Sequence, residues 1–173
     1  MPRSFGYDLW ESWGRGGSAT SLHVVLVTPE IPQNTGSIAR TCVVTGCHLH
    51  LVEPLGFSLD ASRVRRAGLD YWPSVQLSVH PDWTDCLRAL GRRPLRLFTA
   101  HTPRPHTALF YGAEDALVFG RESTGLPPEI LEAWPDAWVR IPMLPGWRSL
   151  NLSNAVSIAV YEALRQIGFP GFV

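Results

Sequence analysis

Polar side chains crowd into one short stretch of the chain, directly before a segment with an apolar helical pattern. Arg148, Ser149, Asn151, Ser153 and Asn154 fall within seven residues. One Ser or Asn side chain is enough to cap the start of a helix. Because five polar groups exceed that need, the stretch is predicted to offer backbone and side-chain donors to a bound small molecule.

A second polar constellation occurs earlier, in TPEIPQNTGSIAR (residues 28–40). Asn34 can cap a helix and Gly36 permits close approach of another backbone. Arg40 follows Asn34 by about one and a half helical turns. Capping is the favoured interpretation of Asn34 taken alone. For Arg40, an ordinary surface position and the binding of a phosphate are both open.

A third unusual stretch is GRESTGLPPEI (residues 120–130), in which Gly120 and Gly125 flank Glu122. This pattern is typical of a backbone bent around a flat or phosphate-bearing ligand, although a plain turn would use the same glycines. It matches neither the G-x-x-x-x-G-K-[ST] phosphate loop nor the dinucleotide pattern G-x-G-x-x-G. ATP hydrolysis and NAD chemistry are therefore not indicated, and no G-x-S-x-G motif indicates a hydrolase.

The elements that must position these stretches are short buried strands alternating with helices. Apolar runs predict five strands, at residues 22–27, 48–52, 95–99, 116–120 and 138–141. Helical patterns cover residues 37–45, the segment between Asp82 and Gly91, a segment opened by Pro127 and Pro128, and residues 153–167. The fold class is thus α/β with a mainly parallel sheet and flanking helices. Since ligands of such sheets bind beyond the carboxyl ends of the strands, the three stretches are the candidate site.

Length and composition limit the remaining possibilities. The chain has 173 residues, 15 basic and 15 acidic, and 45% of it is hydrophobic, as in a globular protein. We expect a tail at residues 1–20 and a single domain at residues 21–173. The zero net charge argues against nucleic-acid binding by bulk charge but permits a local basic face. Three cysteines without metal or disulfide spacing, and no apolar run long enough to span a bilayer, predict a cytoplasmic protein without a membrane partner.

Three further groups of residues have open interpretations. RVRRAGLDYW (residues 63–72) contains Arg63, Arg65 and Arg66, which form either a platform for RNA phosphates or a solvated helix face. Tyr161 lies two turns into the last helix and is either structural or functional. His48 and His50 share one side of a strand, but nothing near them has metal-ligand spacing. We expect the histidines to be satisfied or exposed side chains that do not assemble a site, and no metal is predicted.

Taken together, the three stretches resemble the three motifs of the SPOUT superfamily of RNA 2'-O-methyltransferases. The corresponding sequences here are PEIPQNTGSIAR, VFGRESTGLP and RIPMLPGWRSLNLSNAVSIAVYEA. EPLGF (residues 53–57), RRAGLDYW and the ending RQIGFPG extend the resemblance to the TrmL-type branch, which acts on the cytidine or uridine at the wobble position of tRNA. The resemblance covers residues 22–172.

The resemblance implies a C-terminal deep trefoil knot, which general rules of topology make rare. It also implies a homodimer whose knot holds S-adenosylmethionine, with S-adenosylhomocysteine as product, and in which one subunit contributes residues beside the other subunit's cofactor. By position, the cofactor-binding residues would be Ala100, Gly120, Ile141, Ser149, Leu150, Leu152 and Asn154. Arg121 departs from the family, which has a small residue or Pro after this glycine.

The resemblance assigns the chemistry to Arg40, held in place by Asn34, Glu122 and Asn151, with Arg148 and Tyr161 added to the RNA contacts. A guanidinium keeps its proton at ordinary pH, so polarisation of the ribose hydroxyl and anchoring of a phosphate are preferred to a role as base. The expected function is 2'-O-methylation of the wobble pyrimidine, nucleotide 34, in tRNA. The alternatives are the same reaction on another tRNA or ribosomal RNA nucleotide, or a non-catalytic RNA-binding protein of the same fold.

Overall fold

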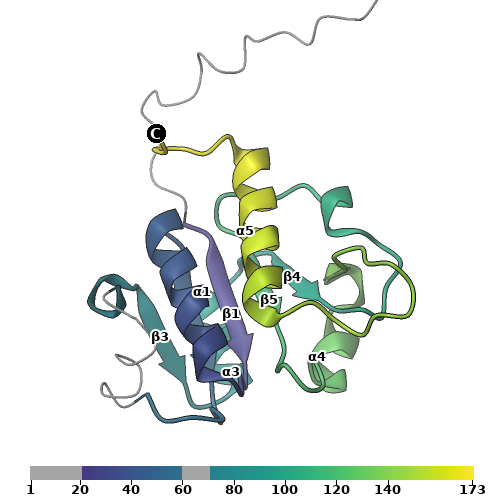
Figure 1. Cartoon of the computed structure of the whole chain (residues 1–173), viewed down its shortest axis with the longest axis horizontal. Coiled ribbons are helices and arrows are strands. Elements are labelled where there is room, and N and C mark those ends of the chain that lie inside the picture. The colour runs from purple at the N-terminus through teal and green to yellow at the C-terminus, as the bar shows by residue number, and fades with distance from the viewer. Residues whose placement is uncertain (1–20, 60–70) are drawn as a thin grey trace, which may run out of the picture.

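The computed structural model describes residues 21–59 and 71–173. Within them six parallel strands form one sheet in the order β3-β2-β1-β5-β4-β6 (Figure 1). Their bounds are β1 His23–Val27, β2 His48–Val52, β3 Leu77–His80, β4 Leu95–Phe98, β5 Ala116–Phe119 and β6 Trp138–Val139. The parallel α/β class is confirmed, and five of the six strands lie where the apolar runs predicted them.

The sixth strand, β3, was not predicted from the sequence. Its residues, LSVH, alternate apolar and polar types, and Ser78 and His80 face the same side of the sheet as histidines of its neighbour β2. This short alternating segment becomes a strand because it pairs in parallel with Leu49–Val52. Pairing with β2 therefore stabilises a strand that the local sequence pattern alone does not predict.

Four α-helices within the described ranges flank the sheet: α1 Pro32–Thr45, α3 Trp83–Leu90, α4 Pro128–Ala133 and α5 Leu152–Ile167. The same ranges contain the 3-10 turns η2 Trp72–Ser74, η3 His106–Ala108 and η4 Pro135–Ala137. Gly46 and Gly168 end α1 and α5 in the left-handed conformation, with φ of 73° and 83°. No helix in the described part of the chain is both long and apolar enough to cross a membrane.

Helix α1 begins earlier than predicted, at Pro32 rather than Ser37, and its N-cap is Ile31. Proline is favoured in the first turn, where its missing N–H costs no hydrogen bond. Asn34 consequently lies inside the first turn, and no side chain of the N-cap residue caps this helix. The capping interpretation of Asn34 is wrong, and its buried side chain is available for another role.

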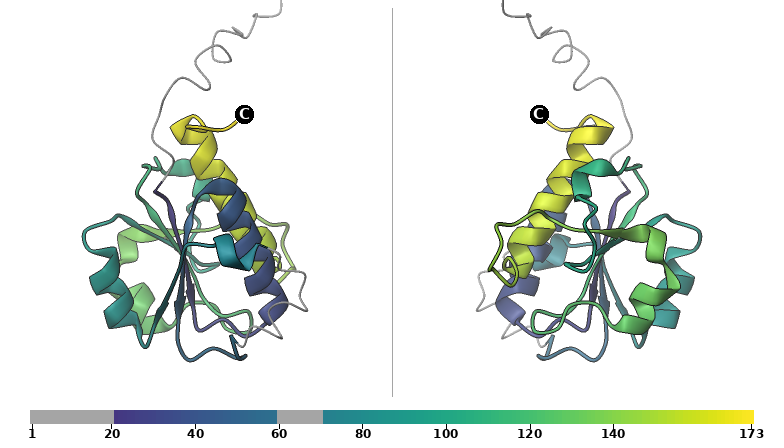
Figure 2. Two further views of the ribbon diagram at one scale, coloured as in Figure 1. Left: turned by 90° about the vertical axis from the view of Figure 1, so that its left-hand side faces the viewer. Right: turned by 90° about the vertical axis from the view of Figure 1, so that its right-hand side faces the viewer.

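The helices form two layers, one on each face of the sheet (Figure 2). Helices α1 and α5 pack on one face, over a core that includes Leu26, Leu49 and Leu117. Helices α3 and α4 cover the other face, over Val25, Val118 and their neighbours. Because strands β1 and β5 at the centre are buried on both faces, their sequences read as continuous apolar runs.

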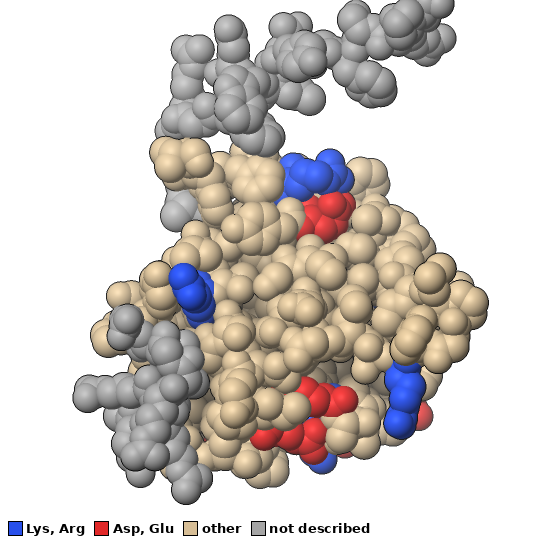
Figure 3. Space-filling view, viewed as in Figure 1, with Lys and Arg blue, Asp and Glu red and all other residues tan. Residues whose placement is uncertain are grey.

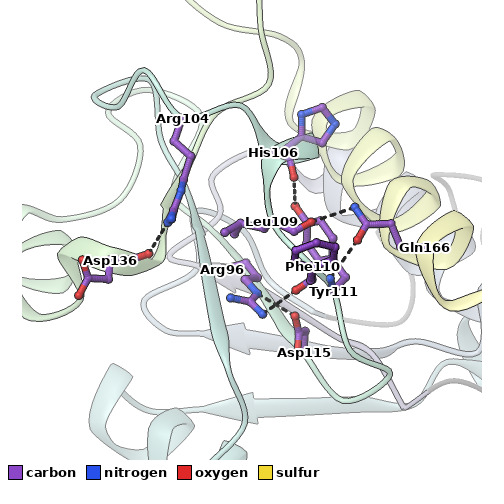
Figure 4. A network of polar contacts seen from close by, with 9 residues as sticks. All are labelled: Arg96, Arg104, His106, Leu109, Phe110, Tyr111, Asp115, Asp136 and Gln166. Carbon is purple, nitrogen blue, oxygen red and sulfur yellow. Dashed lines mark hydrogen bonds and ion pairs between the residues drawn. The ribbon is translucent and has the colours of Figure 1, made fainter.

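A polar network joins the segment before β5 to the last helix (Figure 4). On α5, Gln166 donates to the carbonyl of Leu109 at 3.0 Å and accepts the backbone N–H of Tyr111 at 3.1 Å. The Arg96 guanidinium donates to Asp115, whose side chain is 3% exposed, at 2.7 Å and to the Phe110 carbonyl at 3.0 Å. The connection between β4 and β5 is thereby bound to the C-terminal half of α5.

Candidate functional site

A cavity of about 820 Å³ opens beyond the carboxyl ends of β1, β4, β5 and β6. The stacked rings of Phe98 and Phe119, with centroids 4.5 Å apart, lie at the ends of β4 and β5 and contribute to its wall. All three stretches singled out from the sequence reach it. Ten residues predicted for the site line this cavity: Asn34, Ala100, Gly120, Glu122, Ile141, Arg148, Ser149, Leu150, Asn151 and Leu152.

The turn after β5 is folded tightly against itself at the cavity wall. Gly125 donates its N–H to the Arg121 carbonyl at 2.9 Å and has φ of 76°, which favours glycine. A Cβ on Gly120 would lie 1.9 Å from the Gly125 carbonyl carbon and 2.1 Å from the Leu126 nitrogen. Glycine at position 120 is therefore required for this turn to close.

The Glu122 side chain leaves this turn and accepts hydrogen bonds from the loop that follows β1. Its Oε2 accepts the N–H of Glu30 at 2.8 Å, and its Oε1 accepts Asn34 Nδ2 at 2.9 Å and the N–H of Ile31 at 3.3 Å. The two backbone N–H groups lie at the entry to α1, where donors have no intrahelical partner. The carboxylate is thus the cap that α1 lacks within its own segment.

Glu30, which was not among the predicted site residues, makes the reciprocal contact from the loop after β1 to the turn after β5. Its carboxylate accepts the N–H of Ser123 at 3.0 Å and the Ser123 hydroxyl at 2.9 Å. The hydrogen bonds from the Ser123 hydroxyl and N–H lower the pKa of Glu30. Two carboxylates, Glu30 and Glu122, therefore cross-link the β1 and β5 exit loops. A carboxylate just after a predicted strand exit was the signal that could have identified Glu30.

Asn151 links the third stretch to the first. Its Nδ2 donates to Asn34 Oδ1 at 2.9 Å, while its Oδ1 caps α5 by accepting the N–H groups of Ser153 at 3.0 Å and Asn154 at 3.4 Å. A continuous chain of hydrogen bonds thus runs from Glu122 through Asn34 to the start of α5. Asn154 takes part through its backbone and is not among the residues that line the cavity.

Two arginines outside the predicted set also line the cavity. Arg121 donates from Nε to the Thr28 hydroxyl at 3.0 Å, and Thr28 itself has a positive φ of 50°. Arg140 Nε is buried and has no hydrogen-bond partner among the described residues. Together with Arg148 they give the cavity three guanidinium groups against one lining carboxylate, Glu122, among the described residues. The charge of the lining favours an anionic group on the ligand.

Arg40 and Tyr161 do not line the cavity formed by the described part of their own chain. Arg40 is exposed on α1, with its guanidinium 4.8 Å from the centre of the Tyr71 ring and its Nη2 3.4 Å from the Tyr71 hydroxyl. Tyr161 is 47% exposed on α5. Arg63, Arg65 and Arg66 lie outside the described residues.

Three buried histidines, from β1, β2 and β3, form hydrogen bonds to one another. His23 Nδ1 lies 2.8 Å from His50 Nε2, and His50 Nδ1 lies 2.9 Å from His80 Nε2. Burial, the largest cause, lowers the pKa of His23 to about 4 and that of His50 to about 3, so both rings are neutral at neutral pH. This row lies on the α3 side of the sheet, away from the residues that line the cavity.

Comparisons with known proteins give a consistent result. The model of the SpoU rRNA methylase family matches residues 21–161. A Burkholderia cenocepacia protein named tRNA (cytidine(34)-2'-O)-methyltransferase is 52% identical over 154 residues, which are 87% of this chain and 98% of that protein. An Escherichia coli protein of the same name is 51% identical over 88% of this chain and 98% of its own length.

Solved structures are similar as well. One concerned with 2-OH methylation of C/U34 on tRNA has a TM-score of 0.82 and 44% identity, and covers 87% of this chain and 98% of the other. The methyltransferase AviRb from Streptomyces viridochromogenes, in complex with the cofactor AdoMet, has a TM-score of 0.70 and 25% identity, and covers 96% of this chain and 63% of the other.

Proposed function

The chain belongs to the SpoU rRNA methylase family, and from this premise we propose that it transfers a methyl group from S-adenosylmethionine to the ribose 2'-hydroxyl of the wobble pyrimidine, nucleotide 34, of tRNA. One observation carries the proposal: the relatives named for this reaction at cytidine 34 are about half identical to the chain over nearly their whole length. The similar structure concerned with C/U34 on tRNA supports the same nucleotide.

The cavity fits the proposed cofactor. Its volume is within the range of small-molecule sites, roughly 300–1,000 Å³. Apolar side chains of Ile141, Leu150 and Leu152 offer contacts to an adenosine, and the backbone at Gly120 and Ser149 offers polar ones. Ala100 also lines the cavity, and Asn154 would act through its place in the first turn of α5. When bound, S-adenosylmethionine supplies an activated methyl group on a sulfonium.

Arg40 is the proposed catalytic residue. The 2'-hydroxyl must be held in line with the methyl group while negative charge develops on its oxygen. A guanidinium remains protonated, so Arg40 would polarise this oxygen and hold the adjacent phosphate. Glu122, Asn34 and Asn151 would keep the loops in register through the hydrogen bonds described above.

We further propose that Arg40 acts on the cavity of a second subunit. It is exposed and does not line the cavity formed by the described part of its own chain. The neighbouring faces of α1 and α5 expose Val44, Ile158 and Tyr161 by 54%, 41% and 47%. Among the described residues, this side of the molecule shows few charged side chains (Figure 3). If these faces of two subunits pack together, the exposed apolar side chains become buried, and each Arg40 is brought to the cavity of the other subunit.

The RNA would be bound at the cavity mouth and beyond it. Arg148 is exposed at the cavity and is the proposed phosphate contact there. Tyr161 would contact RNA or the partner subunit. Arg63, Arg65 and Arg66, which lie outside the described residues, would extend the basic surface along the anticodon stem-loop. The proposed location, the cytoplasm, follows from this substrate.

The trefoil knot is part of the proposal. Two contacts support it, both made by the connection between β4 and β5. Ahead of α5, the backbone of Arg140 pairs with this connection by donating to the Arg104 carbonyl at 2.9 Å and accepting the His106 N–H at 2.8 Å. Near the end of α5, Gln166 bonds the same connection at Leu109. The segment before α5 and the end of α5 thus both bind the connection between β4 and β5. A C-terminal segment threaded through that connection would make contacts of this kind.

The test is methyl transfer from labelled S-adenosylmethionine to tRNA, with the modified nucleotide mapped by mass spectrometry. The wild-type chain is expected to label the 2'-oxygen of nucleotide 34, and Arg40→Ala is expected to abolish transfer while cofactor affinity changes little. Arg88→Ala, which changes an exposed arginine on α3, is the matched control and should retain activity. Label at another tRNA nucleotide or on ribosomal RNA would contradict the proposed substrate.

Mixing two inactive variants tests the exchange between subunits. Arg40→Ala leaves the cavity intact, whereas Asn151→Ala damages the cavity and leaves Arg40 in place. If Arg40 serves the partner, a mixed dimer contains one complete site, and activity returns after the subunits are exchanged. If Arg40 serves its own chain, each site of a mixed dimer still carries one of the two defects. Persistent inactivity of the mixture is therefore the outcome that opposes the proposal.

A further inference from the structure

Three histidines form a hydrogen-bonded row on the α3 side of the sheet, one from each of β1, β2 and β3. The row extends from His23 through His50 to His80, and these residues are 8%, 3% and 5% exposed. At its far end the Asp85 carboxylate on α3 lies 3.8 Å from His80 Nδ1. The proposed methyl transfer uses none of these groups.

The row has a definite direction. A carboxylate beside His80 Nδ1 favours a proton on that nitrogen and leaves the lone pair on Nε2. His80 Nε2 faces His50 Nδ1, and His50 Nε2 faces His23 Nδ1. Each neutral ring has one N–H and one lone pair, so every contact in the row is satisfied when all the rings carry their proton on Nδ1.

A thiol completes a set of three metal-binding groups. Cys86, on α3 and fully buried, lies so that its Sγ and one ring nitrogen each of His50 and His80 are all within 4.8 Å of one another. Two imidazoles and one thiolate are soft and borderline ligands, which select late transition-metal ions over Mg²⁺ and Ca²⁺. We propose that His50 Nδ1, His80 Nε2 and Cys86 Sγ bind one Zn²⁺-class ion.

The surrounding contacts suit this role. Histidine ligands of metals usually donate their other N–H to a carboxylate, a carbonyl or another acceptor, which fixes the ring. His23 stands in that position for His50, and the Asp85 carboxylate, which also accepts from Arg88, lies 3.8 Å from His80 Nδ1, close enough to tighten into such a contact when the ion is bound. The two ligating nitrogens are 2.9 Å apart, and tetrahedral Zn²⁺ with bonds of about 2.0–2.1 Å needs them about 3.3 Å apart. Binding would therefore separate these nitrogens by a few tenths of an ångström, turn both rings so that their lone pairs converge on the ion, and draw in Cys86 Sγ, which lies within 4.8 Å.

The protons can be followed through the row when the ion binds. When the ion takes the lone pair of His50 Nδ1, the proton of that nitrogen moves to His50 Nε2. His23 Nδ1 then accepts it in a hydrogen bond, and the proton of His23 Nδ1 moves to its own Nε2. The rings thus lose no proton in total, and the thiol of Cys86 releases one, so that the site gains one unit of positive charge.

This proposal departs from the expectation that no metal is bound, which rested on the spacing of the three cysteines and of His48 and His50. A strand that the sequence did not predict, β3, supplies His80, and the first turn of α3 supplies Cys86. A second group, formed by His23, His48 and His50, shares His50 with the first. His48 Nε2 lies 2.9 Å from the Ser78 hydroxyl, and this group has no thiol, so it is the weaker candidate.

The experiment uses Co²⁺ as the probe with the full chain after chelator treatment. One equivalent is expected to bind and to produce thiolate-to-cobalt charge-transfer absorption with ligand-field bands typical of a tetrahedral site. Cys86→Ser and His80→Asn should lose the charge-transfer band, and Asp85→Asn should bind about 10-fold more weakly or worse, since it removes only the outer contact. Zn²⁺ should displace Co²⁺ and raise the melting temperature of the wild-type chain.

Matched controls separate this site from binding elsewhere. Cys47→Ala removes another buried thiol and His101→Gln removes a histidine outside the row, and neither should change the spectrum. Melting curves show whether each variant folds, and a variant that does not fold is replaced by Asp85→Asn. Absence of the charge-transfer band in the folded wild type, or its persistence in Cys86→Ser, would overturn the proposal. Methyl transfer is not a readout, so the outcome is independent of the proposed function.

Discussion

Asn34 is the most informative residue to change, because its side chain joins Glu122 to Asn151. It is 7% exposed, donates to the Glu122 carboxylate at 2.9 Å and accepts from Asn151 Nδ2 at 2.9 Å. A hydrogen bond to a charged group contributes about 1.5–3 kcal/mol and a neutral one about 0.5–1.5 kcal/mol. Asn34→Ala should therefore lower the free energy of unfolding by about 2–4.5 kcal/mol.

Asn34→Asp separates geometry from charge. It keeps the shape and an oxygen for Asn151, but it replaces the donor to Glu122 with a second carboxylate at hydrogen-bond distance. Like charges so close should make this change at least as destabilising as Asn34→Ala at neutral pH. Urea denaturation of both variants measures the effect. Gln33→Ala, which changes an exposed neighbour in the same turn of α1, serves as the control and should leave the free energy of unfolding nearly unchanged.

A double-mutant cycle with Glu122→Gln measures the coupling between the two side chains directly. If the Asn34–Glu122 contact holds the two loops together, the two single changes should be non-additive by about 1 kcal/mol or more. Strict additivity, or a loss below about 0.5 kcal/mol for Asn34→Ala, would refute the reasoning that this contact bridges the loops.

Three further outcomes are expected. Gly120→Ala forces a Cβ into the facing backbone, so calorimetry should show at least about 10-fold weaker S-adenosylmethionine binding, and unchanged binding would contradict the close packing of the turn. Arg96→Ala leaves the buried Asp115 carboxylate unpaired, and urea unfolding should show a loss of about 3 kcal/mol, with a smaller loss in Asp115→Asn. Hydrogen bonding to Arg165 lowers the pKa of Glu162 from 4.5 to about 2; the resulting stability is present above pH 4.5 and is lost as the pH falls toward 2. Because Arg165 is largely exposed, Glu162→Gln should remove only about 1 kcal/mol at pH 7 and flatten the stability curve across this window.

The sequence predicted the elements that depend on local pattern. Short apolar runs identified β1, β2 and β5, and glycines that adopt positive φ identified the ends of α1 and α5. The residue types around Glu122 and Asn151 also indicated a site, because parallel strands bring their exit loops to one edge of the sheet.

The parts that depend on tertiary contact could not be predicted in the same way. Asn34 was expected to cap α1 because the sequence does not show that Glu122, 88 residues away, caps the helix instead. Glu30 was not predicted because its partner, Ser123, is equally remote in the chain. The histidine row crosses three strands, and its members appear in the sequence only as isolated histidines.

The paired carboxylates Glu30 and Glu122 have a mechanical consequence. Each loop holds the other at two points, so the turn after β5 and the first turn of α1 cannot shift independently. Arg40 lies further along the same helix, α1. A displacement of this turn by an occupant of the cavity would therefore be passed on to α1 and to the Arg40 guanidinium on its outer surface.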